Sequence, residues 1–211
     1  MLPPFDYLRD PEAIYRRSFE LARAASDLSA IPEELHGLAL RLVHACGMPE
    51  ILDGLAWGGV IVAAGRRALK AGAPIIVDCR MLAEGITRAR LPVGNEVLSV
   101  LNDPAVPRLA RELATTRSAA AVELWRPRLE GAVVAIGNAP TALFRLLELQ
   151  REGAPRPAAL LAFPVGFVGA AESKEALIES GLDIPYVTLR GRRGGSALAA
   201  AAVNALAADR P

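Results

Sequence analysis

The sequence has little histidine and cysteine, with two of each in 211 residues, and Cys46 and Cys79 form no CxxC motif. So few metal-binding side chains, spaced so far apart, argue against a structural zinc site, and isolated thiols indicate a reducing, cytoplasmic location. The sequence also lacks a membrane-length apolar run and a signal-peptide pattern at its start. Its 24 basic and 23 acidic residues give a net charge of +1, which argues against nucleic acid or membrane as the main partner.

Apolar segments of strand length alternate with segments of helical periodicity. Strands are expected at 74–78, 95–101, 132–137, 157–166 and 183–190, and helices at 11–28, 32–47, 58–72, 106–114, 116–129, 141–153, 173–180 and 194–208. The alternation predicts an α/β fold, a single layered domain over 1–211 with a mostly parallel sheet flanked by helices. Ligands of such folds bind beyond the carboxyl ends of the strands.

Four joints between elements carry small polar or basic side chains where a helix is expected to begin. At 137–140, Asn138 precedes Pro140, and free N–H groups there favour a carboxylate or phosphate. The other joints supply Thr87 and Arg88, Arg117 and Ser118, and the segment 190–196 with Arg192, where Ser196 is expected to cap the last helix. Together the joints predict a site for a ligand with several anionic groups. A nucleotide-binding enzyme is disfavoured, because the Walker lysine and the GxGxxG spacing are absent.

His44 lies near the end of the helix expected at 32–47. It points about 180° from the middle of the apolar stripe of that helix, so it faces solvent, a cleft or another subunit. Two interpretations stay open, a solvated histidine and a proton donor or acceptor that titrates near neutral pH. Cys46 lies on the opposite face, so the two cannot form a Cys–His pair within the helix.

Seven segments of the chain resemble the precorrin-8X methylmutase family of cobalamin biosynthesis. The resemblance spans residues 7–206 and is carried by YLRDPEAIYRRSFELAR, HACGMPE, GITRARLP, TRSAAA, AVVAIGNAPTALFRLLEL, PVGFVGAAESKEAL and RGRRGGSALAAAAVNAL. It implies an isomerase that moves a methyl group from C-11 to C-12 of precorrin-8X to give hydrogenobyrinate without a cofactor. It also implies that His44 protonates the ring C nitrogen and that Ser18 contacts the substrate.

The resemblance implies a ligand for the predicted site, because this tetrapyrrole is a flat macrocycle with many carboxylate arms that the arginines and N–H groups of the site can bind. It further implies a homodimer with the site near the interface, and it leaves open a hand-off to a downstream cobalamin-pathway enzyme. Two alternatives remain: the same isomerisation of cobalt-precorrin-8 to cobyrinate, and a non-catalytic corrinoid carrier.

Overall fold

Six short strands form the centre of the molecule in a computed structural model that describes residues 5–208. Their order is β1-β6-β5-β4-β2-β3, and only β1 runs antiparallel to its neighbour. The strands are β1 (Leu55–Gly58), β2 (Ile75–Val77), β3 (Val97–Leu98), β4 (Val133–Ile136), β5 (Ala159–Ala162) and β6 (Tyr186–Leu189). The predicted α/β class and mostly parallel sheet are confirmed.

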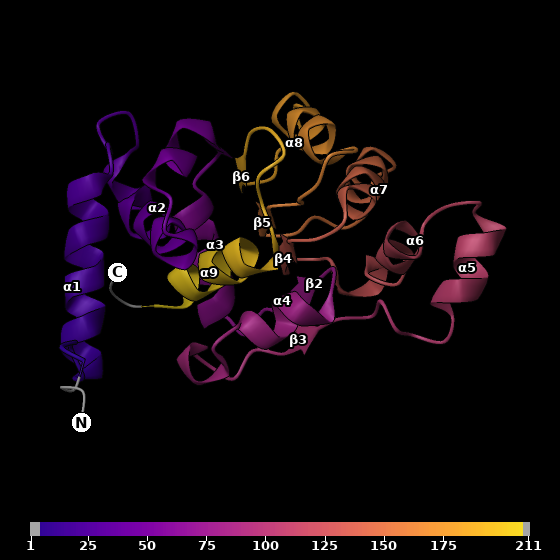
Figure 1. The fold of residues 1–211 in the computed structure, drawn as a ribbon. Helices are drawn as coiled ribbons and strands as arrows, with labels where there is room; N and C mark the ends of the chain where they lie inside the picture. Colours follow the sequence, from indigo (N-terminus) through magenta and orange to yellow (C-terminus); the bar gives the residue numbers. More distant parts are fainter. Residues whose placement is uncertain (1–4, 209–211) are drawn as a thin grey trace.

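Helices cover both faces of the sheet (Figure 1). The described elements are α1 (Pro11–Ala25), α2 (Glu33–Cys46), η1 (Pro49–Gly54), α3 (Ile61–Lys70), α4 (Arg80–Gly85), η2 (Arg88–Arg90), α5 (Val106–Glu112), α6 (Arg117–Glu123), η3 (Arg126–Arg128), α7 (Pro140–Arg151), α8 (Ala170–Ile178) and α9 (Ser196–Ala207). None of them is long and apolar enough to cross a bilayer.

Alternate residues of the central strands enter two separate cores. Val133 and Ala135 of β4 join the core under α2, α3, α4 and α9, whereas Val134 and Ile136 join the core under α6, α7 and α8. All four are fully buried, as expected for a parallel strand covered on both sides, whose sequence is therefore apolar without alternation. The carboxyl ends of β2, β4, β5 and β6 lie at one edge of the sheet.

Several element boundaries differ from the sequence predictions. The segment 55–58 forms the edge strand β1, which the sequence analysis missed, so α3 begins three residues after the predicted start at 58. The helix predicted over 116–129 is interrupted after Glu123 and resumes as the short 3-10 turn η3. In the segment 95–101 only Val97 and Leu98 pair with β2. The two ends of the predicted domain, 1–4 and 209–211, lie outside the described residues.

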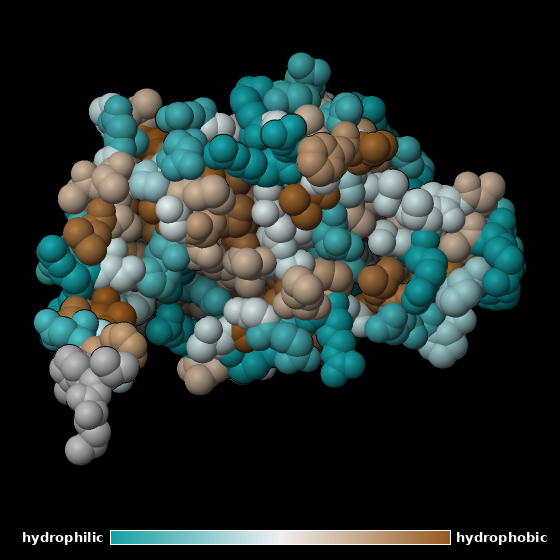
Figure 2. Space-filling view, viewed as in Figure 1, coloured by the Kyte–Doolittle hydropathy of each residue, from teal (hydrophilic) through white to brown (hydrophobic). Residues whose placement is uncertain are grey.

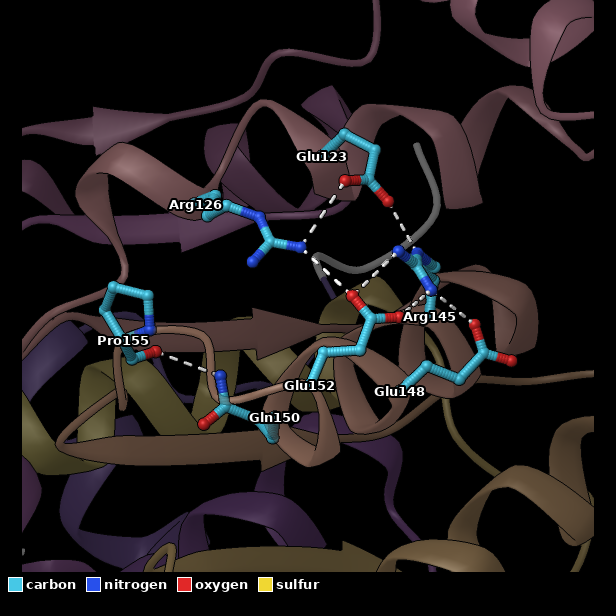
Figure 3. Close-up of polar contacts among 7 residues, drawn as sticks. All are labelled: Glu123, Arg126, Arg145, Glu148, Gln150, Glu152 and Pro155. Carbon is cyan, nitrogen blue, oxygen red and sulfur yellow. Dashed lines mark hydrogen bonds and ion pairs between the residues drawn. The ribbon is translucent and has the colours of Figure 1, made fainter.

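An ion-pair network joins α6 and η3 to α7 (Figure 3). Arg145 of α7 donates to Glu123 at 2.5 Å, to Glu148 at 2.9 Å and to Glu152 at 2.9 Å, and Arg126 of η3 donates to Glu152 at 3.2 Å. The network holds α6 against α7, and α6 begins with two of the predicted site residues.

Helix α1 lies outside both layers and packs on α2 (Figure 1). It begins where the sequence predicts, because the Asp10 carboxylate accepts hydrogen bonds from the N–H groups of Glu12 and Ala13 at 3.2 Å. No residue of α1 is fully buried. This helix covers the face of α2 that carries His44.

Candidate active site

His44 and Ser18 meet between α2 and α1. His44 stands in the last turn of α2, which ends at the left-handed Gly47 as predicted, and its Nδ1 lies 2.8 Å from Ser18 Oγ. In the tautomer in which the serine hydroxyl donates to Nδ1, the imidazole proton is on Nε2. The imidazole remains exposed to solvent. The structure therefore brings together the predicted proton donor and the predicted substrate-contacting serine.

Two aromatic rings of α1 lie beside the imidazole. Phe19 stacks on it with ring centroids 4.8 Å apart and planes 22° apart, and the Tyr15 ring lies 6.1 Å away. Partial burial lowers the pKa of His44, and the nearby guanidinium of Arg41 lowers it further. The periodicity of α2 predicts only that this face lies towards solvent, a cleft or a second subunit, whereas the structure has α1 of the same chain on it.

An apolar pocket of about 370 Å³ opens beside the end of α2. Ala45 and Cys46, the two residues that follow His44, line this pocket. Phe167 from the loop after β5 and Arg192 from the loop after β6 also line it. The Arg192 guanidinium lies 5.3 Å above the Phe167 ring. The pocket thus combines an apolar wall with a predicted carboxylate-binding arginine. Figure 2 shows apolar and small side chains over much of the middle of the visible face, with most of the hydrophilic groups towards its margins.

The helix start at 137–140 is not a free anion site, and this prediction was wrong. The buried carboxylate of Asp78, at the end of β2, accepts hydrogen bonds from the N–H groups of Gly137 at 3.0 Å, Asn138 at 2.9 Å and Ala139 at 2.8 Å. Burial raises the pKa of Asp78, and the three N–H donors act in the opposite direction. An internal carboxylate therefore occupies the position that was assigned to the ligand, whereas the Asn138 side chain remains exposed.

Ser196 does not cap α9, contrary to the prediction. Gly195 is the residue before the helix, and the Ser196 hydroxyl lies 3.2 Å from the Cys79 thiol. A Cβ atom on Gly137 would lie 2.7 Å from Ser196 Cα, so only glycine lets β4 and α9 approach this closely. Burial raises the pKa of Cys79, which makes it a poor nucleophile.

Three of the four predicted joints gather at the carboxyl edge of the sheet. Thr116 caps α6 and its hydroxyl also lies 2.8 Å from that of Thr141 in α7, which places Arg117 and the half-buried Ser118 near the Asn138 joint. Arg117 also donates to the Leu101 carbonyl at 3.2 Å, so part of its role is to hold the preceding loop.

The fourth joint lies apart from the other three. The Thr87 N–H donates to the Asn204 side chain at 2.9 Å, near the end of α9. Leu198, which lines the pocket, is six residues earlier in that helix, or about 9 Å along its axis. Thr87 and the exposed Arg88 therefore lie away from the pocket. Among residues 5–208, no group of three His, Cys, Asp or Glu side chains lies close enough together to hold a metal ion.

Comparisons with known proteins identify the family. The family described as CbiC, precorrin-8X methylmutase, matches residues 13–209. A precorrin-8X methylmutase of Pseudomonas aeruginosa is 60% identical, with coverage of 97% of this chain and 99% of the relative. A cobalt-precorrin-8 methylmutase of Priestia megaterium is 33% identical, with coverage of 93% and 87%. The precorrin-8X methylmutase structure from Thermus thermophilus matches with a TM-score of 0.84 and 40% identity, covering 93% of this chain and 94% of that one. The chain therefore belongs to the precorrin-8X methylmutase family, the isomerases of cobalamin biosynthesis.

Proposed function

We propose that this protein moves a methyl group from C-11 to C-12 of precorrin-8X, giving hydrogenobyrinate, with His44 as the proton donor. The observation that carries the proposal is the pair formed by His44 and Ser18, because a serine on Nδ1 fixes the ring and leaves Nε2 for the substrate. A proton delivered to a ring nitrogen of the macrocycle polarises the conjugated system through which the methyl group migrates. Relatives with this printed activity match the chain over nearly its full length.

The surroundings of His44 suit a flat, many-armed organic acid. The pocket beside α2 offers apolar walls to the macrocycle, and Arg192 offers a guanidinium to one carboxylate arm. Arg117, Ser118 and Asn138 lie farther along the same edge of the sheet for other arms. Thr87 and Arg88 take part only if the substrate extends along α9, so we rank them below Arg192 as binding residues.

The homodimer belongs to the same proposal. On α1, Ile14 and Leu21 are 45% and 51% exposed and lie on the same helix face as Ser18. Together these two side chains form an exposed apolar strip along α1. A second copy of the chain on this strip buries it and brings the interface close to His44. Sedimentation velocity of the wild type and of Leu21→Lys tests this, since a monomeric wild type contradicts it.

The cobalt-bearing substrate is the first alternative. Relatives named for cobalt-precorrin-8 are less similar, such as the 33% identical one, than the 60% identical relative named for precorrin-8X. The preference for the metal-free substrate rests on this difference. A corrinoid carrier is the second alternative, and it has no need of an oriented imidazole.

One assay separates the three functions. Purified protein is supplied with precorrin-8X and, separately, with cobalt-precorrin-8, and the visible spectrum and the mass are followed. An isomerase changes the chromophore while the mass of the tetrapyrrole stays constant. A carrier binds the compound without converting it. Binding without conversion of both compounds would contradict the proposed activity.

The proposal also covers the cellular location of the protein and the transfer of its product. We place the protein in the cytoplasm, where the two unpaired cysteines stay reduced. A hand-off of product to a downstream enzyme of the cobalamin pathway predicts that product release speeds up when that enzyme is added.

A further inference from the structure

Two parallel polar contacts join α1 to α2. The Arg41 Nη2 group donates to the Tyr15 hydroxyl at 2.5 Å, and the Ser18 hydroxyl lies 2.8 Å from His44 Nδ1. Tyr15 and Ser18 are three residues apart on α1, and Arg41 and His44 are three residues apart on α2, so each pair shares a helix face. The register of the two helices that makes the first contact also makes the second.

Arg41 is an unusual residue at this place. It is only 7% exposed, and its Nε atom is buried without a hydrogen-bond partner. Among residues 5–208 no carboxylate forms an ion pair with it, and its guanidinium lies 5.2 Å from the Phe19 ring centroid and 5.8 Å from that of Tyr15. A buried charge without a counter-ion costs free energy of folding, so its presence here calls for a functional reason. An apolar side chain of similar length would fill the same space at lower cost.

We propose that Arg41 and Tyr15 are positioning residues for His44, an inference that rests on its proposed role as the proton donor. The pair holds α1 in the register that places Ser18 against Nδ1, and it keeps a permanent positive charge one helical turn from the imidazole. Neither residue needs to touch the substrate, since both act through His44.

The charge has a consequence for the protonation of His44. Burial and the Arg41 charge both lower the pKa of His44, which favours the neutral imidazole when no substrate is bound. A substrate with several carboxylates brings negative charge to the same place and raises that pKa again. The histidine therefore gains its proton mainly when the site is occupied, which couples proton delivery to substrate binding.

Apart from the half-buried Arg66 of α3, the other charged groups on the elements around α2 are paired or exposed. On α1, Arg17 pairs with Glu20 at 3.2 Å, and Arg16 pairs with Glu12 at 3.5 Å. The described helix α9 carries no ionisable side chain between Ser196 and Ala207. The remaining charged side chains of the neighbouring elements are Arg23 of α1, Arg66, Arg67 and Lys70 of α3, and Glu50 and Asp53 of η1. Of all these groups, Arg41 is the one whose charge acts on the imidazole.

The test is a titration of the His44 imidazole by NMR in the full-length protein without substrate. Because the chain has only two histidines, His36 serves as an internal reference, and His36→Gln assigns the two signals. Arg41→Met keeps the length and removes the charge, so it should raise the pKa of His44. Arg41→Lys keeps the charge and should leave the pKa low. Arg17→Met, an equal change of charge on an exposed residue of α1, should move neither histidine.

The positioning role has its own readout. Tyr15→Phe removes the hydroxyl that Arg41 binds, so it should lower kcat about tenfold with little change in KM. The inference is overturned if the His44 titration of Arg41→Met matches the wild type, or if Tyr15→Phe keeps the wild-type kcat. If His44→Ala still turns over substrate while Arg41→Met raises the pKa of His44, the proposed function fails and the control of the imidazole by Arg41 stands.

Discussion

Ser18 Oγ lies 2.8 Å from His44 Nδ1, so a residue of the outermost helix orients the imidazole at the end of the next one. The two residues are 26 positions apart in the chain, and α1 packs mainly on α2, whereas α2 packs mainly on α9. Because α1 has no fully buried residue, this orientation depends on a few contacts at one interface. Changes at that interface should therefore affect chemistry more than stability.

Ser18→Ala should lower kcat by about tenfold, the effect of losing one hydrogen bond that orients the reacting group. Thermal stability should change little, because Ser18 is only half-buried. Steady-state kinetics with precorrin-8X, together with a melting curve, checks both statements. Ser29→Ala, in the loop after α1, is the matched control and should keep the wild-type kcat. An unchanged kcat in Ser18→Ala would show that the serine does not orient His44.

The pH dependence of kcat/KM should report the lowered pKa of His44. Turnover needs one proton on His44, and kcat/KM reports the pKa of the free enzyme. It therefore falls as the pH rises through this pKa, which lies below the ordinary value of 6.5. The measurement is a kcat/KM profile between about pH 5 and 8, where the substrate carboxylates stay ionised. His44→Ala should abolish turnover while binding of the tetrapyrrole persists. A profile that rises with pH across this range would contradict the assignment of His44 as the donor.

Arg192→Ala should weaken tetrapyrrole binding by roughly tenfold, the effect of one charge-assisted hydrogen bond to a carboxylate arm. The kcat at saturating substrate should change much less, because Arg192 does not contact the imidazole. Arg80→Ala is the control, since that arginine is exposed and pairs with Glu84 on α4. The binding of both variants is measured by isothermal titration calorimetry at two salt concentrations. Arg192→Ala should show a weaker salt dependence of binding than Arg80→Ala, because it has lost a carboxylate contact. Equal affinities for both variants would remove Arg192 from the site.

Asp78→Asn should destabilise the protein by about 2–4 kcal/mol, because three backbone N–H groups lose a buried carboxylate and meet an amide with a single acceptor oxygen. Urea unfolding gives the free energy of unfolding. Asp103→Asn is the matched control, as this exposed carboxylate accepts one N–H bond, from Ala105 at 2.8 Å, and should cost less than about 1 kcal/mol. If both variants unfold at the same urea concentration, Asp78 does not hold the Asn138 joint.

Much of the fold follows from local patterns. The run 132–137 is apolar without alternation, which predicts a strand buried on both faces, and Asp10-Pro11 marks the start of α1 because an acidic cap and a proline suit a first helical turn. The strand β1 escaped prediction because four residues between two turns carry too weak a periodic signal. Its pairing with β6 depends on residues more than 120 positions away.

The sequence by itself determined the α/β class, the helix that ends at Gly47, His44 and Ser18 as separate candidates, and the family. These features depend on local periodicity and on motifs of consecutive residues, both of which can be recognised in the sequence alone. Only the tertiary structure decided that Asp78 fills the helix start assigned to a ligand, that the joint with Thr87 and Arg88 lies apart from the others, and that a buried Arg41 stands beside the imidazole. The physical reason is that hydrogen bonds and charges act through space, between residues that the folded chain brings together from distant positions.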